Sequence, residues 1–119
     1  MEERGYDISG SGVIKWKGQI IARIEQISIH IYPESISLNI RRIPATASLI
    51  KALLSSDELK LEVITEVNNF FYIAKEAMIN RFTIEGKKGE ILYLTDIEMI
   101  TLEIEKMPKH ALSEKVWNR

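Results

Sequence analysis

The sequence predicts a mainly β fold, an antiparallel β-sandwich or barrel built of long hairpins with one short helix inserted between them. Three observations lead to this prediction. Apolar residues recur at every second position over long stretches, which is the period of a strand with one buried face. Clusters of Gly, Asn, Pro and Ser separate these stretches, as turns between strands require. A spacing of four between apolar residues, which is typical of a helix, appears between Leu49 and Leu54.

The segment 19–42 is predicted to form the central hairpin, with its turn at Tyr32-Pro33-Glu34-Ser35. Folding the chain there brings six apolar side chains onto one face, in the pairs Ile31–Ile36, Ile29–Leu38 and Ile27–Ile40. The opposite face carries mostly short polar side chains, from Ser28, His30, Tyr32, Ser35, Ser37, Asn39 and Arg41. This polar face is either an ordinary solvated face or one turned toward a neighbour or an enclosed channel.

Strands on both sides of this hairpin follow from the same alternation. A first strand is expected over Val13–Lys17, with Gly18 in the turn that leads into the hairpin. The apolar residues move from even to odd positions at Glu25-Gln26, which predicts a β-bulge there. Residues 59–64 are predicted to start the next strand, and Asn68-Asn69 to form the turn that follows it.

Two long strands are predicted in the second half of the chain. One runs from Phe70 to Ile84, with a bulge or bend near Lys75-Glu76. The loop 85–90 closes a hairpin that sets Ile84 opposite Ile91 and Phe82 opposite Tyr93. The last strand is expected from Leu92 to about Met107, where Pro108 ends it, with inward side chains from Ile100, Leu102 and Ile104.

One helix is predicted over residues 46–56. Its first turn is capped by Thr46 or Ser48, and the pairs 49/53 and 50/54 form an apolar stripe that covers the sheet core as a lid. We expect one domain over residues 12–107, an N-terminal arm over 1–11, and a tail over 108–119 that forms a short helix or a docking segment. Four apolar or aromatic side chains in the arm and tail are the expected assembly anchors: Tyr6, Ile8, Val116 and Trp117.

Composition sets limits on function. Hydrophobic residues make up 45% and charged residues 28% of the 119-residue chain, as in a folded protein. No apolar run approaches the roughly 18–20 residues that span a bilayer, and the acidic, polar first residues do not resemble a signal peptide. The absence of cysteine excludes disulfides and thiolate metal sites, and it fits synthesis in a reducing cytoplasm. The net charge of −1 gives no long-range attraction for nucleic acid.

No residue pattern indicates a reaction. The two histidines, His30 and His110, lie in the polar face of the hairpin and in the tail, where neither is paired with a nucleophile by spacing. The loop Gly86-Lys87-Lys88-Gly89 lacks the Lys-Ser/Thr ending of a phosphate-binding loop. We therefore expect no enzymatic activity, no catalytic residues, no cofactor and no metal site.

The order of the parts resembles a known superfamily. A Gly-containing arm precedes a strand that ends at Lys17-Gly18-Gln19, two long strands follow, a short helix comes after Arg41-Arg42, and two further long strands flank the segment 82–90. Over roughly residues 10–107 this layout is similar to the tail-tube proteins of bacteriophages and related contractile injection machines. That superfamily includes the haemolysin-coregulated protein of type VI secretion.

The resemblance implies a structural role. Subunits of such tubes form hexameric rings that stack, and hairpins from neighbouring subunits build one inner barrel. It implies that the polar face lines a channel for DNA or protein cargo, and that the partners are further copies of the chain and sheath, baseplate or adaptor proteins. It also implies a place in a virion tail or injection particle of a bacterial system. The alternative is a small β-barrel binding module that uses the same polar face for a peptide or regulatory partner.

Overall fold

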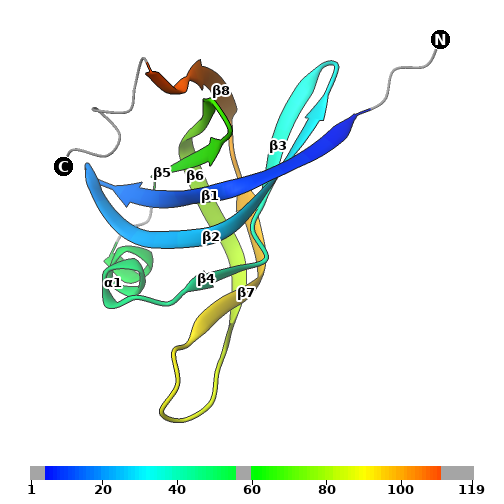
Figure 1. Ribbon diagram of the computed structural model, residues 1–119. Coiled ribbons are helices and arrows are strands. Elements are labelled where there is room, and N and C mark those ends of the chain that lie inside the picture. The colour runs from blue at the N-terminus through cyan, green and yellow to red at the C-terminus, as the bar shows by residue number, and fades with distance from the viewer. Residues whose placement is uncertain (1–4, 56–59, 111–119) are drawn as a thin grey trace.

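The computed structural model describes residues 5–55 and 60–110 of the chain, and in that part the fold is mainly β, antiparallel and contains one short helix (Figure 1). This confirms the predicted fold class. The elements, in chain order, are β1 (Tyr6–Trp16), β2 (Gln19–Tyr32), β3 (Ser35–Asn39), β4 (Arg42–Pro44), α1 (Ala47–Ser55), β5 (Leu61–Val67), β6 (Phe70–Glu85), β7 (Tyr93–Ile100) and β8 (Glu103–Pro108).

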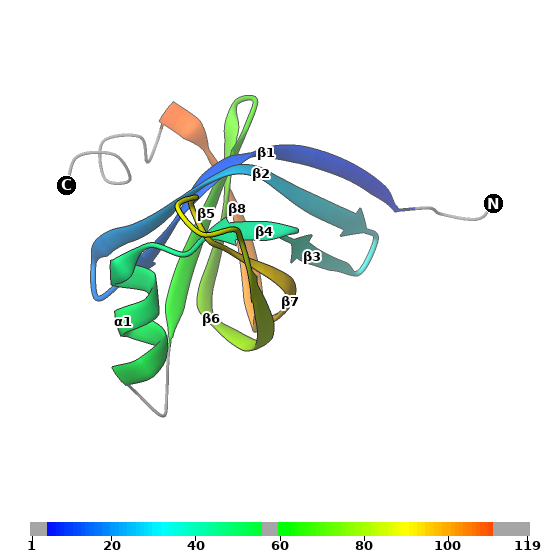
Figure 2. The same cartoon turned by 90° about the horizontal axis from the view of Figure 1, so that it is seen from below.

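The eight strands belong to one sheet, in the order β3-β2-β1-β5-β6-β7-β4, with β8 also paired to β6. The sheet curls over itself, so that β3 comes next to β8 and β4 comes next to β2. Figure 2 shows β1 and β2 on one side of the molecule, β6 and β7 on the other, and β4 between them. Within the described residues no backbone ladder joins β3 to β8 or β4 to β2. The sheet is therefore folded like a sandwich and is not closed into a barrel.

The central hairpin has the predicted register. Ile31 pairs with Ile36 and Ile29 with Leu38, on either side of the turn at Pro33-Glu34. Residues Glu25 and Gln26 of β2 together face Ser11 of β1, which places a β-bulge at the predicted position. A second bulge, which was not predicted, lies at Ile21, where β2 gains one residue over β1 and turns the Ile21 side chain into the core.

The first strand is longer than predicted. It begins at Tyr6, so Tyr6–Ser11, which the sequence assigns to an arm, form the first half of β1 and pair with β2. Two glycines of β1 allow a close approach of this strand to β5. A Cβ atom at Gly10 would collide with the carbonyl oxygen of Glu66, and one at Gly12 with that of Ile64.

The second half of the chain contains the predicted turn and bulge but a different pairing. Asn68-Asn69 form the β5–β6 turn, and a bulge at Lys75-Glu76 faces Glu62. The predicted register of the β6–β7 hairpin is wrong, because Ile84 pairs with Leu94 and Glu85 with Tyr93.

The predicted last strand is also wrong as a single element. The chain breaks at Thr101-Leu102 into β7 and β8, which pair with different halves of β6. Leu102 and Ile100, expected inward, are exposed, whereas Ile104 packs partly against the core. The short strand β4 was not predicted, since three residues are too few for a pattern to be seen.

The helix α1 confirms the predicted position and cap. The backbone N–H of Leu49 donates to Thr46 Oγ1 at 3.1 Å, so Thr46 and not Ser48 is the N-cap. The apolar stripe is shifted from the prediction: Leu49 and Ala52 are buried, but Leu54 is 82% exposed. The tail helix is predicted over residues 110–117, of which 111–117 lie outside the described residues.

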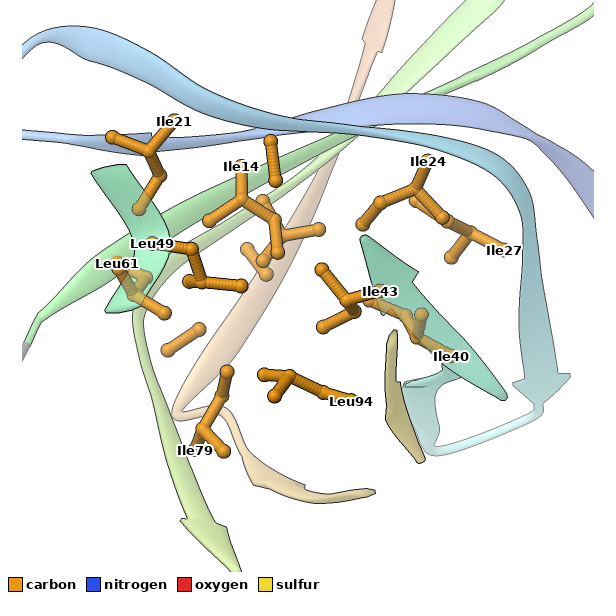
Figure 3. Close-up of a cluster of buried hydrophobic side chains, with 14 of the residues drawn as sticks. Ile14, Ile21, Ile24, Ile27, Ile40, Ile43, Leu49, Leu61, Ile79 and Leu94 are labelled. Atoms are coloured by element: carbon orange, nitrogen blue, oxygen red, sulfur yellow. The ribbon is translucent and has the colours of Figure 1, made fainter. Parts of the chain in front are cut away.

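The core lies inside the curled sheet, under α1 (Figure 3). Its members come from almost every element, among them Ile14 of β1, Ile27 of β2, Ile43 of β4, Leu49 of α1 and Leu94 of β7. A smaller second cluster of Val13, Ile64, Phe71 and Ile73 lies on the other face of β1, β5 and β6. The sheet is thus buried on both faces at its centre, while the β1–β2–β3 end extends away from it.

Candidate functional site

The predicted polar face is present and is wider than the sequence indicated. Ser37 and Asn39 of β3 are exposed, and Ser28 and His30 of β2 are partly buried. The extension of β1 adds a third strand to this face, since Ser9 pairs with Ser28 and Asp7 with His30. Rows of short polar side chains therefore cross three strands, for example Ser9–Ser28–Asn39.

His30 is held within this face by a neighbour on β1. Its Nδ1 lies 2.5 Å from Oδ1 of Asp7. Asp7 and His30 are directly paired residues of β1 and β2, so the contact stabilises the register of these two strands where they extend away from the core. The contact with Asp7 therefore gives His30 a structural role in the sheet.

The expected assembly anchors divide into three groups. Tyr6 is 58% exposed at the start of β1, and Tyr32 beside the hairpin turn is also exposed, so two aromatic side chains lie at the projecting end. Ile8 packs partly against the core instead of standing free. Val116 and Trp117 lie outside the described residues.

A polar groove of about 1080 Å³ lies between the β1–β2–β3 end and the β4–β7 pair. Three residues of the predicted polar face, Ser28, Asn39 and Arg41, line it, whereas His30, Tyr32, Ser35 and Ser37 do not. The groove forms where the sheet fails to close: β3 ends at Asn39, and the chain crosses from there to β4. We call this site the arginine groove, because Arg23, Arg41 and Arg42 line it together.

The three arginines reach the groove from different elements. Arg23 lies on β2, Arg41 in the β3–β4 connection and Arg42 on β4, and all three are exposed. None of them forms an ion pair with a carboxylate in the part of the chain that the structure describes. The Arg42 guanidinium lies over the ring of Tyr93, with Cζ 4.3 Å from the ring centroid. This cation–π contact orients the planar group and leaves its edge N–H donors directed along the plane.

Two carboxylates and several hydroxyls complete the lining. Glu25 comes from the β2 bulge, and Asp96 comes from β7 beside Thr95. Thr83 Oγ1 lies 2.8 Å from Thr95 Oγ1 and 3.4 Å from Oδ2 of Asp96. The groove therefore offers three guanidinium donors, two carboxylate acceptors, and the hydroxyls of Ser9, Ser11 and Ser28.

The described residues contain no group of three or more His, Asp or Glu side chains placed to hold a metal ion. No helix among them is long and apolar enough to cross a membrane.

Sequence reasoning identified the face but not the groove. Arg23, Tyr93 and Asp96 are far apart in the chain, and β4, which brings Arg42 beside Tyr93, is too short to predict. The one local signal was the bulge at Glu25-Gln26, because bulges redirect side chains at functional positions. In comparisons with protein-family models, with curated proteins and with solved structures, nothing matched the chain.

Proposed function

We propose that this chain is a self-assembling structural protein, a subunit of hexameric rings in a phage tail tube or a related injection machine. The observation that carries the proposal is the edge strand β3. It stands at the end of the strand order, and its sequence Ser35-Ile-Ser-Leu-Asn39 contains neither a charge nor a proline. Monomeric proteins usually protect such an edge with charged residues, a proline or a covering segment, because an open edge pairs with other chains.

The face beside this edge supports the same proposal. Its side chains are mostly short and uncharged, and its one histidine is already paired with Asp7. Copies joined through β3 would place this face on the inside of a ring, where short polar side chains leave room for DNA or protein cargo to pass without being bound. The aromatic side chains of Tyr6 and Tyr32 stand exposed at the same end and supply apolar contact area for a neighbouring subunit.

A binding module is the second candidate function, and the arginine groove favours it. The groove exists on a single copy and adjoins the same polar face. In that case the chain stays monomeric or dimeric and recognises a peptide or regulatory partner.

The test uses two double variants that add the same charge. In Ser28→Lys/Ser37→Lys the new ammonium groups lie on the polar face, so in a ring they converge on the channel and repel one another. In Gln19→Lys/Ser48→Lys they lie on exposed positions outside that face. We expect negative-stain images and light scattering to show rings or tubes for the parent and the second variant, and their loss for the first.

Two results would contradict the proposal in different ways. Assembly of Ser28→Lys/Ser37→Lys as readily as the parent means that the face does not line a channel. A parent protein that remains monomeric at high concentration means that self-assembly itself is wrong and favours the binding module.

A further inference from the structure

The arginine groove carries a small excess of positive charge on a chain whose net charge is −1. Three guanidinium groups meet two carboxylates there, and no ion pair between them is present in the described residues. By contrast, Arg81 outside the groove lies 3.9 Å from a Glu98 oxygen. Arginines that share a groove without a carboxylate partner are suited to bind an anion supplied from outside.

The volume and openness of the groove argue for an extended ligand. At about 1080 Å³ it is at the upper end for a small-molecule pocket and far larger than a single anion. Its arginines stand on β2, on the β3–β4 connection and on β4, so they reach the groove from different elements. A ligand that pairs a separate anionic group with each of them carries several negative charges.

The two carboxylates in the groove favour a polypeptide ligand over a nucleic acid. Glu25 and Asp96 would repel the continuous negative charge of a phosphodiester chain. A polypeptide carries its negative charges on side chains, and its backbone N–H groups can donate to carboxylates and to amide oxygens such as that of Asn39. The hydroxyls of Ser9 and Ser28 can serve its carbonyl groups.

We propose that the arginine groove binds an extended, acidic segment of another protein, whose carboxylates pair with Arg23, Arg41 and Arg42. Arg42 is the central contact, because its stacking on Tyr93 fixes the guanidinium before the ligand arrives and lowers the entropy that binding must remove. The site is complete on one copy of the chain, so the inference does not depend on ring assembly.

The experiment measures fluorescence anisotropy of labelled probes with the full-length protein at low salt. The main probe is a short peptide of alternating glutamate and serine, and its control has glutamine at each glutamate. A labelled thymidine oligonucleotide of similar length is the third probe. The glutamate peptide binds, the glutamine peptide binds about tenfold more weakly or worse, and the oligonucleotide binds more weakly than the glutamate peptide.

Variants place the binding in the groove. Arg41→Ala/Arg42→Ala lowers the affinity for the glutamate peptide by about tenfold or more. Arg23→Ala also lowers this affinity, and because Arg23 lies on β2 its effect cannot come from a local change in β4. Arg81→Ala, an exposed arginine outside the groove, leaves the affinity unchanged. Far-UV circular dichroism and thermal melting confirm that each variant is folded.

Three results would overturn the inference. The glutamate peptide fails to bind the parent, or binds the groove variants as tightly as the parent, or binds more weakly than the oligonucleotide. The last result would identify the groove as a nucleic-acid site. Because anisotropy is read at concentrations where light scattering shows monomers, failure here leaves the assembly proposal untouched, and failure of assembly leaves this one untouched.

Discussion

Thr46 Oγ1 donates a hydrogen bond of 2.5 Å to the carbonyl oxygen of Ile21, across the gap between β2 and the start of α1. The same oxygen accepts the N–H of Leu49 at 3.1 Å. Ile21 is the bulged residue of β2, so this side chain joins the helix to an irregular point of the sheet. The Thr46 hydroxyl thus caps α1 and also attaches the helix to β2. No ladder joins β2 to β4 in the described residues, so this bond is a separate link between the two parts of the chain.

We expect Thr46→Ala to lower the free energy of unfolding by about 1–2 kcal/mol, since it removes the cap and the link to β2 together. Urea denaturation measures the loss. Ser48→Ala, an exposed change in the same turn, should shift it by less than about 0.5 kcal/mol. Thr46→Ser keeps the hydroxyl and should recover most of the loss. An equal cost for the Ser48 and Thr46 variants would show that this hydroxyl has no special role.

We expect Ile29→Asp to unfold the domain. Ile29 is fully buried in the core, and an unpaired carboxylate there costs more than about 4 kcal/mol, a large part of the stability of a domain of this size. Ser37→Asp is the matched control on the same hairpin, because Ser37 is exposed on the opposite face. Near-UV and far-UV circular dichroism should show a folded Ser37 variant and an unfolded Ile29 variant. A native spectrum for Ile29→Asp would contradict the assignment of faces.

We expect Thr65→Val to stabilise the protein by about 1 kcal/mol. Thr65 is fully buried on β5, and its hydroxyl has no hydrogen-bond partner among the described residues. Valine keeps the shape and removes the group that burial penalises. Thr65→Ser keeps the hydroxyl and removes a buried methyl, so it should destabilise by about 1 kcal/mol. A loss of stability in the valine variant, read by thermal melting, would mean that the hydroxyl is satisfied in solution.

Local patterns predicted the local structure well. The register of the central hairpin, both bulges named from sequence, the Asn68-Asn69 turn and the Thr46 cap all depend on residues close together in the chain. The predictions are wrong where residues far away in the sequence determine which strands pair. Apolar residues alternate from Ile100 through Leu102 to Ile104, across the boundary between β7 and β8, so nothing in the sequence shows that β6 exchanges one partner for the other near Ala77. Gly10 was assigned to an arm because β5, the strand that it approaches at Glu66, lies far away in the sequence.

The candidate site was likewise predictable only where it depends on residues close together in the sequence. The polar face of β2 and β3 was predictable, because a two-residue period assigns every side chain of a strand to one face or the other. The arginine groove was not, since it needs five strands and the unpaired gap between β2 and β4 to come together. Of its charged residues, Arg41 was predicted on the polar face, Glu25 at a bulge and Arg42 ahead of the helix, whereas Arg23 and Asp96 were not singled out.

The strand β6 also decides where the length of this chain can change. It pairs with β5 along one edge, and with β8 and then β7 along the other. One inserted or deleted residue in β6 would reverse the side-chain alternation against at least one of these neighbours, and only irregular points of the ladders, such as the bulge at Lys75-Glu76, offer a place to absorb it. The exposed segment 86–91 between β6 and β7 carries no such constraint. Insertions, affinity tags or grafted loops therefore belong there, where they lengthen a connection without moving a ladder.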